Sequence, residues 1–450
     1  MSLEQFGYED QLDRALTLTD LIVYGMIFMV PIAPFAVFGF AWQGARGMVA
    51  LTYLIGMVGM LFTALSYAAM SRAFPLAGSV YAYVQRGLHE FAGFLAGWLI
   101  LLDYILIPAL LYLFSAVALQ PLLPAVPEWA WLAGFVSLNA AANLVGVRFT
   151  ARVNKWLLVF ELLTLALFVI FGALALRRGA GAGGLTLAPL YDAHDFSLTL
   201  VAGATSIAVL SFLGFDGIST LAEESNGGRN AVARATVLSL VLIGGLFILQ
   251  TWIAADLGRG MRFDDPSTAF YDIAARAGGN PLRLLAIVAI AVSFGIANAM
   301  AAQAAVSRVL FAMARDRKLP AILAAVHPRF KTPYVSTLLV AVISLVVGLF
   351  FASRIDDLTR VVNFGALTSF ALLHLAVAYH HLVRRRTGDW MRHLIFPLIG
   401  FVVIAYVLYG MDRTAKILGG CWVAAGILYY LILARGARGR PGILSLEIDP

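Results

Sequence analysis

The sequence contains little charge and almost no cysteine. Only 13% of its 450 residues are charged, whereas a soluble protein has about 25%, so too few polar side chains are available to cover a surface in contact with water. Because 61% of the residues are hydrophobic, the composition also excludes a disordered chain. The single cysteine, Cys421, excludes an internal disulfide bond and a thiolate metal cluster.

Signatures of nucleotide and metal binding are also missing. The glycine-rich run Gly179–Gly184 lacks the Lys-Ser/Thr pair that follows in a phosphate-binding loop, which disfavours ATP-driven transport. The histidines show no zinc-like spacing. The net charge of +7 is spread over short loops between apolar runs, which argues against nucleic acid as a partner. We therefore expect no cofactor and no bound metal ion.

Long apolar runs dominate the chain. A bilayer span needs about 20 mostly apolar residues, and the sequence contains twelve such runs. Because lipid cannot satisfy the backbone groups of an open strand, these runs predict an all-α integral membrane protein with the lipid bilayer as its solvent. The predicted spans are 17–41, 48–71, 90–119, 127–146, 153–176, 197–222, 234–257, 282–306, 334–353, 359–382, 393–410 and 416–434.

The basic residues predict the orientation of these spans. Most of the 32 Lys and Arg residues fall in loops on the same side as the N-terminus, and loops rich in Lys and Arg remain in the cytoplasm. We therefore expect cytoplasmic termini, made by residues 1–16 and 435–450. The polar stretch Met1–Asp20 does not resemble a cleavable secretory signal.

Two of the spans are interrupted. In the first, Pro31 and Pro34 each remove an amide donor and disfavour helix before the ring, and in the sixth, Gly214 and Gly217 flank a carboxylate. Simple kinks are the alternative explanation. However, breaks that are five spans apart fit two halves of opposite orientation, 17–176 and 197–383, with residues 390–434 as two peripheral spans. Secondary transporters built in this way bind substrate where the broken helices meet.

Three carboxylates lie deep inside predicted spans: Asp103, Glu161 and Asp216. A charge there costs about 2.5–3.5 kcal/mol even on the lenient insertion scale, and no Lys or Arg lies at comparable depth. The interior therefore binds a cation, carries protons, or does both. Asp216 is the strongest candidate because it lies in the sixth-span break, although it could simply cap the second half-helix.

The other buried polar residues have structural alternatives. Asp103 could be a neutral, hydrogen-bonded acid between helices, and Glu161 could pair with a neighbouring helix. His374 lies in the middle of the tenth span, where packing is more common than a proton relay. Four aromatic residues flank the proposed site, namely Phe28, Tyr104, Phe212 and Phe215. They could attract an ammonium group or act as gates, although most aromatic residues in membrane proteins serve packing.

Several motifs resemble those of the amino acid–polyamine–organocation transporter superfamily. The likeness covers about residues 15 to 390, and the motifs are Phe74–Tyr81, Gly214–Glu224, Ser307–Asp316 and His327–Pro333. The stretches Leu101–Tyr104, Met29–Pro34 and Asn363–Leu367 are most similar to the bacterial putrescine importer group.

This resemblance implies a LeuT-like fold of five plus five inverted spans with two peripheral helices, working by alternating access. It also implies a substrate site at the two breaks and the third span, in a protein of the bacterial inner (plasma) membrane. Apart from the resemblance, we expect a proton bound at Glu161 or Asp103 to couple the transport. The implied substrate-binding residues are Met29, Val30, Ile32, Asp103, Tyr104, Phe212, Gly214, Phe215 and Asp216.

Two departures from the family pattern bear on the substrate and the coupling ion. Amino-acid carriers place small residues with free amides in the first break, where this chain has Met29–Pro31, so capture of a substrate carboxylate should be weaker. Many family members carry a lysine where Glu161 aligns, and a glutamate could carry a proton instead.

The sequence thus predicts a transporter, not an enzyme. The expected function is proton-coupled import of an organic amine, above all a polyamine such as putrescine. The runner-up is an amino-acid permease or exchanger of the same superfamily. A nutrient receptor or a membrane enzyme is a more distant alternative, because no catalytic cluster is visible.

Overall fold

The computed structural model describes residues 16–76, 78–120, 122–145, 147–227, 229–352 and 354–437. These residues form helices joined by short connections, and none of them forms a β-strand. Most of the helices are long and hydrophobic, which agrees with the all-α prediction.

The first half of the chain contains the helices that correspond to the first five predicted spans. They are α1 Leu18–Met29, α2 Pro34–Ala45, α3 Val49–Ala73, α4 Ser79–Gly87, α5 Glu90–Leu119, α6 Glu128–Val145 and α7 Val147–Arg177. Helix α4 was not predicted as an element, because its nine residues are too short to be recognised as a span.

The second half contains the remaining spans and several short irregular helices. They are α8 Leu198–Ala208, η2 Val209–Phe212, η3 Phe215–Glu224, α9 Arg229–Gly258, α10 Ala269–Val292, η4 Ser293–Asn298, α11 Ala299–Arg315, η5 Ala321–Ala324, α12 Tyr334–Phe351, α13 Ile355–Ala378, η6 Tyr379–Arg384, η7 Met391–Ile395, α14 Phe396–Gly410 and α15 Arg413–Ala437. Helix α10 begins before the predicted eighth span and bends at Gly278 and Gly279.

By length and composition, the described residues contain 10 helices able to cross a membrane, or 11 if α1 and α2 are counted as one bent span. Helix α6 covers the predicted fourth span but is not among them. The structure therefore supports a multi-pass protein with about 10 or 11 strongly apolar spans.

The two predicted breaks are confirmed. Helix α1 ends at Met29 and α2 starts at Pro34, with a bend of 49° between them. Val30, in the connection, has a φ of 48°, a strained value for a β-branched residue. In the sixth span the α-helix ends at Ala208, and the chain continues through η2, a turn at Gly214 and η3.

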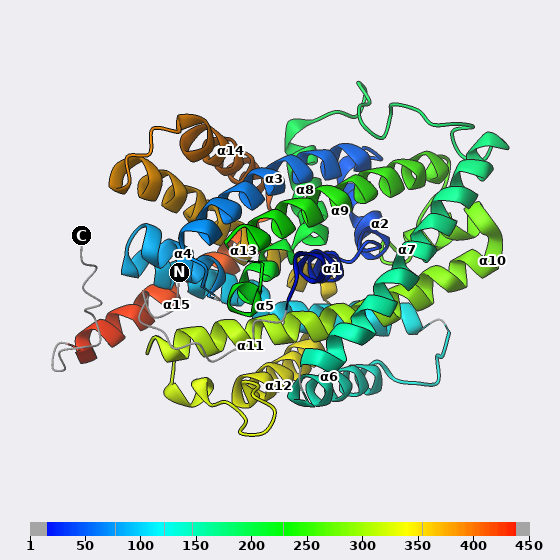
Figure 1. The fold of residues 1–450 in the computed structure, drawn as a ribbon. Helices are drawn as coiled ribbons and strands as arrows, with labels where there is room; N and C mark the ends of the chain where they lie inside the picture. Colours follow the sequence, from blue (N-terminus) through cyan, green and yellow to red (C-terminus); the bar gives the residue numbers. More distant parts are fainter. Residues whose placement is uncertain are drawn as a thin grey trace.

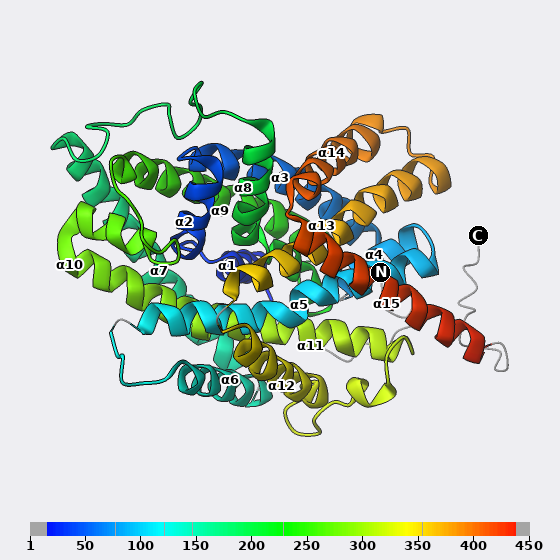
Figure 2. The same ribbon diagram turned by 180° about the vertical axis from the view of Figure 1, so that it is seen from behind.

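The broken spans lie at the centre of the molecule. Helix α1 packs against η3, and α2 packs against α8, so the pieces of the two breaks are paired. Helices α5 and α11 run alongside this centre, whereas α14 and α15 lie at the edge (Figure 1). The reverse view shows α6 and α12 together at another edge of the bundle (Figure 2).

Candidate substrate site

A cavity lies where the two breaks meet. It encloses about 680 Å³ when open space at its mouth is included. Its wall is built from the end of α1, the start of α2, the middle of α5, the chain around Gly214, the π-helix η4 and helix α11. The wall is mainly hydrocarbon, and the only charged residue in it among the described part of the chain is Asp103.

Four of the nine predicted substrate-binding residues line this cavity. They are Met29, Asp103, Tyr104 and Gly214. The breaks therefore bring together side chains that are far apart in sequence, as the predicted site requires. Whether these residues bind substrate stays a prediction.

Asp103 and Asp216 differ in their access to the cavity. Both are at most 1% exposed, and they lie close enough to interact electrostatically. Asp103 belongs to the wall, whereas Asp216 does not. The Oδ2 atom of Asp216 accepts a hydrogen bond from the Tyr104 hydroxyl, and Tyr104 itself lines the cavity. Asp216 is thus connected to the cavity wall through its hydrogen bond with Tyr104.

Both carboxylates have unused hydrogen-bonding capacity. The Oδ1 atoms of Asp103 and Asp216 are buried, with no hydrogen-bond partner among the described residues. A buried oxygen without a partner is costly, because it has lost its hydration and gained nothing in return. An ammonium group or a proton would compensate for this loss.

Phe212 and Phe215 do not line the cavity, contrary to the expectation that they shape or gate it directly. The Phe212 ring packs against Tyr53 and Phe247, and the Phe215 ring packs against Tyr67 and Phe370. Both side chains are fully buried. The chain around Gly214 is not a regular helix, and both side chains point into the hydrophobic core and not into the cavity.

Val30 and Ile32 are also absent from the cavity wall. Both are fully buried in the connection between α1 and α2. The break itself is in the predicted place, but the residues of it that line the cavity are Phe28, Met29 and Ala33. The side chains of Val30 and Ile32 belong to the hydrophobic core instead.

Glu161, the predicted coupling residue, lies on α7 and is fully buried. Neither of its carboxylate oxygens has a hydrogen-bond partner among the described residues. Its polar neighbour is Ser293, the first residue of the π-helix η4. The next residue, Phe294, lines the cavity, so Glu161 is connected to the cavity wall through a single turn of irregular helix.

His374 makes contacts that join neighbouring helices. Its ring nitrogens lie 3.2 Å from Thr63 Oγ1 and 2.9 Å from Ser66 Oγ, both on α3. The ring also packs closely against Gly400 on α14. These contacts connect three helices away from the cavity, which favours the packing alternative over a proton relay.

Three polar residues near the cavity were missed by the sequence analysis. The Ser211 Oγ lies 2.8 Å from the Tyr53 hydroxyl, Asn298 lines the cavity, and the Gln250 amide donates to the Pro31 carbonyl at 2.9 Å. All three are uncharged polar residues inside apolar spans. A search for amides and hydroxyls at membrane depth would have found them, whereas the search for charges did not.

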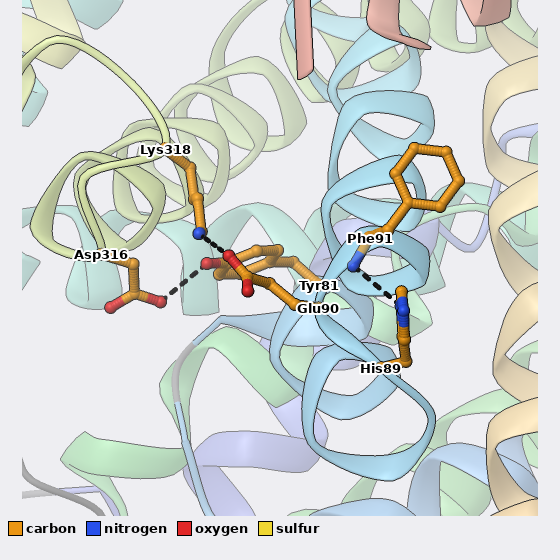
Figure 3. Close-up of polar contacts among 6 residues, drawn as sticks. All are labelled: Tyr81, His89, Glu90, Phe91, Asp316 and Lys318. Atoms are coloured by element: carbon orange, nitrogen blue, oxygen red, sulfur yellow. Dashed lines mark hydrogen bonds and ion pairs between the residues drawn. The ribbon is translucent and has the colours of Figure 1, made fainter. Parts of the chain in front are cut away.

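Polar contacts close one end of the bundle, where α11 approaches α4 and the start of α5. The Tyr81 hydroxyl donates to Asp316 Oδ2 at 2.8 Å, and Lys318 forms an ion pair with Glu90 (Figure 3). The motifs Phe74–Tyr81 and Ser307–Asp316 therefore contact one another in space. At the same end, Arg308 pairs with Glu224 at the end of η3 at 3.1 Å.

A metal centre is not found among the residues that the structure describes, since no three His, Cys, Asp or Glu side chains converge in them. The chemistry available at the cavity is that of two carboxyl groups, a phenol, a few uncharged polar groups and a hydrocarbon wall. Such a site can hold a cation through charge and hydrogen bonds.

The chain is similar in sequence to known transporters. Residues 15–428 match the family described as amino acid permease. The chain is 30% identical to the low-affinity putrescine importer PlaP of Escherichia coli K12, over 95% of both chains. It is 24% identical to the branched-chain amino acid permease BcaP of Bacillus subtilis, over 95% of this chain and 94% of that one. It is also 26% identical to the methylthioribose transporter of Bacillus subtilis, over 94% of each chain.

These relatives and the many apolar helices point to a multi-pass protein of the bacterial inner membrane. The family match covers nearly the whole chain, including both breaks and the cavity between them. The protein belongs to the amino acid permease family of the amino acid–polyamine–organocation superfamily, and it is a transporter and not an enzyme.

Proposed function

We propose that this protein imports an organic amine, most favourably a polyamine such as putrescine, by proton-coupled alternating access. The observation that carries the proposal is the position of Asp103. It is the only charged residue among the described residues of the cavity wall, and no basic side chain lies beside it there to neutralise it. A substrate ammonium group would provide the missing counter-charge.

The first break adds to this preference for a cation. Phe28 and Met29, which line the cavity, lie at the C-terminal end of α1, where a helix carries partial negative charge. Pro31 has no amide hydrogen to offer to a carboxylate, and its carbonyl already accepts from Gln250. The break is therefore better suited to an ammonium group than to the carboxylate of an amino acid.

The similarity to a putrescine importer supports the same substrate class. Import of a cation is also favoured by the membrane potential, by about 2.3 kcal/mol per charge per 100 mV. We propose a proton as the coupling ion, carried by Glu161 or Asp103, because a buried carboxyl without a partner is stable when protonated.

The architecture that we propose for this cycle is the LeuT-like one. Spans within residues 17–176 and 197–383 would form two inverted repeats, with residues 390–434 as peripheral helices and with α6 as a twelfth, less apolar span. The pairing of α1 with η3 and of α2 with α8 supports this symmetry. Both termini would lie in the cytoplasm, although residues 1–15 and 438–450 are outside the described part of the chain.

Uptake into proteoliposomes tests the proposed function. We expect labelled putrescine to accumulate, and an inward-directed proton gradient to increase the rate. Asp103→Asn should abolish uptake, whereas Asp272→Asn should retain it, since Asp272 is a partly exposed residue paired with Arg283. Putrescine uptake that is unaffected by Asp103→Asn would contradict the proposal.

The alternative substrate class is an amino acid, which the similarity to a branched-chain amino acid permease supports. Competition distinguishes the two. Unlabelled diamines should inhibit uptake if the polyamine proposal holds, whereas inhibition by amino acids but not by diamines would select the amino-acid permease.

A further inference from the structure

The two acidic residues at the cavity are not equivalent, because Asp103 lines the wall whereas Asp216 does not and is hydrogen-bonded to Tyr104. Asp103 and Tyr104 are adjacent on α5 and both line the cavity. Asp216 lies outside the wall, and its Oδ2 atom holds the Tyr104 hydroxyl. A ligand that enters the cavity therefore meets Asp103 first and reaches Asp216 only if the phenol moves away.

We propose that Tyr104 makes the site selective for diamines: its hydroxyl occupies the ammonium position on Asp216 and is displaced only by the second ammonium group of a ligand already held at Asp103. This inference rests on the proposed function, and it adds a residue that discriminates between diamines and monoamines. It assigns different roles to the two carboxylates, with Asp103 as the entry site and Asp216 as the selective site.

A diamine can displace the phenol more easily than a monoamine can, because its two ammonium groups bind in linked steps. The phenol–carboxylate hydrogen bond is charge-assisted when Asp216 is ionised, and such bonds are among the stronger ones in proteins. A free monoamine must compete with it from solution. The second ammonium of a diamine bound at Asp103 is tethered nearby, so its effective concentration is in the millimolar range or higher.

The unpartnered oxygens are consistent with this exchange. The Oδ1 atoms of Asp103 and Asp216 have no hydrogen-bond partner among the described residues, so Asp103 can accept from the first ammonium group. The Oδ1 atom of Asp216 is buried, so it becomes available to the second ammonium group only after the phenol has left Oδ2. Replacing the phenol by an ammonium also exchanges a neutral donor for a charged one on Asp216. A ligand with one ammonium and one carboxylate gains no such exchange and would place its carboxylate near two acids.

Binding measurements on the purified full-length protein test the proposal. The probes are putrescine and 1-butylamine, which have the same carbon chain and differ by one ammonium group. Tyr104→Phe should strengthen 1-butylamine binding by about tenfold, the change expected from the loss of one charge-assisted hydrogen bond. It should therefore reduce the preference for putrescine over 1-butylamine.

Tyr112→Phe provides the matched control. Tyr112 lies on the same helix, is buried, does not line the cavity, and has a hydroxyl with no hydrogen-bond partner among the described residues. We expect it to leave both affinities unchanged. Asp216→Asn should itself remove the preference for the diamine, and adding Tyr104→Phe to it should have no further effect.

The outcomes separate this inference from the proposed function. If the wild type binds putrescine but Tyr104→Phe weakens both ligands equally, Tyr104 contacts the ligand directly and the inference is wrong. An unchanged preference in Tyr104→Phe or in Asp216→Asn would also overturn it. If the wild type binds neither amine, the polyamine function itself fails. If Tyr104→Phe does not fold, the preference of Asp216→Asn for putrescine over 1-butylamine tests the inference instead.

Discussion

Gly214 lies against the main-chain carbonyl of Phe28, so close that a Cβ atom at Gly214 would lie 2.7 Å from the carbonyl oxygen. This contact joins the break of the sixth span to the break of the first. Gly214 also has a φ of 111°, which only glycine adopts without strain. The two breaks are therefore held together at a point where no side chain fits.

Gly214→Ala should consequently destabilise the centre of the fold. The unfavourable φ alone costs about 1–2 kcal/mol, and the backbone clash adds to it, so we expect a loss of more than about 2 kcal/mol and almost no substrate uptake. Thermal unfolding of the purified variant and uptake into proteoliposomes measure the two effects.

Gly217→Ala is the control for this substitution. The atoms nearest to a Cβ atom at Gly217 would be those of the Phe28 ring, at 3.2 Å, and φ at this position is not positive. The ring can shift by a few tenths of an ångström, so the unfolding temperature of this variant should remain close to that of the wild type. Equal effects of the two substitutions would show that the contact with the Phe28 carbonyl is not what requires glycine.

Gln250→Met should weaken the first break. The side-chain amide of Gln250 donates to the carbonyl of Pro31 and to that of Leu246. The methionine side chain has a similar shape, but its thioether cannot donate a hydrogen bond. Leaving the buried Pro31 carbonyl without this donor costs about 1–3 kcal/mol. We expect a lower unfolding temperature and a raised KM for the transported amine.

Thr251→Val distinguishes this effect from a general loss of polarity in α9. The Thr251 hydroxyl donates only to carbonyls of its own helix, Phe247 and Ile248. We expect little change in KM for this variant. A similar rise in KM for both variants would argue against a specific role of Gln250 at the break.

The breaks could be predicted from sequence because proline and glycine act on the backbone itself. Pro31 and Gly214 change which hydrogen bonds and φ values are possible, whatever surrounds them. Helix α4 and the first turns of α10 could not be found in this way. They are short, and their placement depends on packing against neighbouring helices, which hydropathy along the chain does not report.

Side-chain direction was the part of the site that sequence could not supply. Asp103 and Tyr104 lie on a regular helix, and both reach the cavity. Phe212 and Phe215 flank a non-helical turn, where neither the period of an α-helix nor that of a strand applies, and the structure buries both rings in the core. The search for charges identified the carboxylates but overlooked Gln250, whose amide supports the break without any charge.

Glu161→Gln should uncouple transport from the proton gradient. The substitution keeps the shape of the side chain but removes its ability to take up and release a proton. We expect putrescine counterflow, which needs no net proton movement, to persist, while the acceleration by an inward proton gradient is lost. Wild-type uptake should fall as the external pH rises, because the driving proton becomes scarce, whereas Glu161→Gln should be nearly independent of pH.

Glu128→Gln, at the start of α6 and away from the cavity, should behave as wild type in the same assays. If Glu161→Gln retains its full response to the proton gradient, coupling must lie elsewhere, and Asp103 becomes the remaining candidate. Loss of counterflow together with the pH response would instead indicate a role in folding or in substrate binding.

The ion pair of Lys318 with Glu90 should stabilise the end of the bundle at which α11 meets α5. The side chains are 7% and 28% exposed, so removal of one partner leaves a charge in a poorly hydrated position. Glu90→Gln should therefore lower stability by about 1–3 kcal/mol. Exchange of the charges in the double variant Glu90→Lys/Lys318→Glu should recover a large part of this loss.

The exposed ion pair of Arg46 with Asp195 is a control for the contribution of burial to stability. Arg46 and Asp195 form a bridge at 3.1 Å, with side chains that are 59% and 42% exposed, and such pairs contribute about 0–1 kcal/mol. Asp195→Asn should thus change the unfolding temperature much less than Glu90→Gln. If the two substitutions have equal effects, or if the charge exchange recovers nothing, Glu90 stabilises this end through packing or the α5 N-terminus, and not through its ion pair with Lys318.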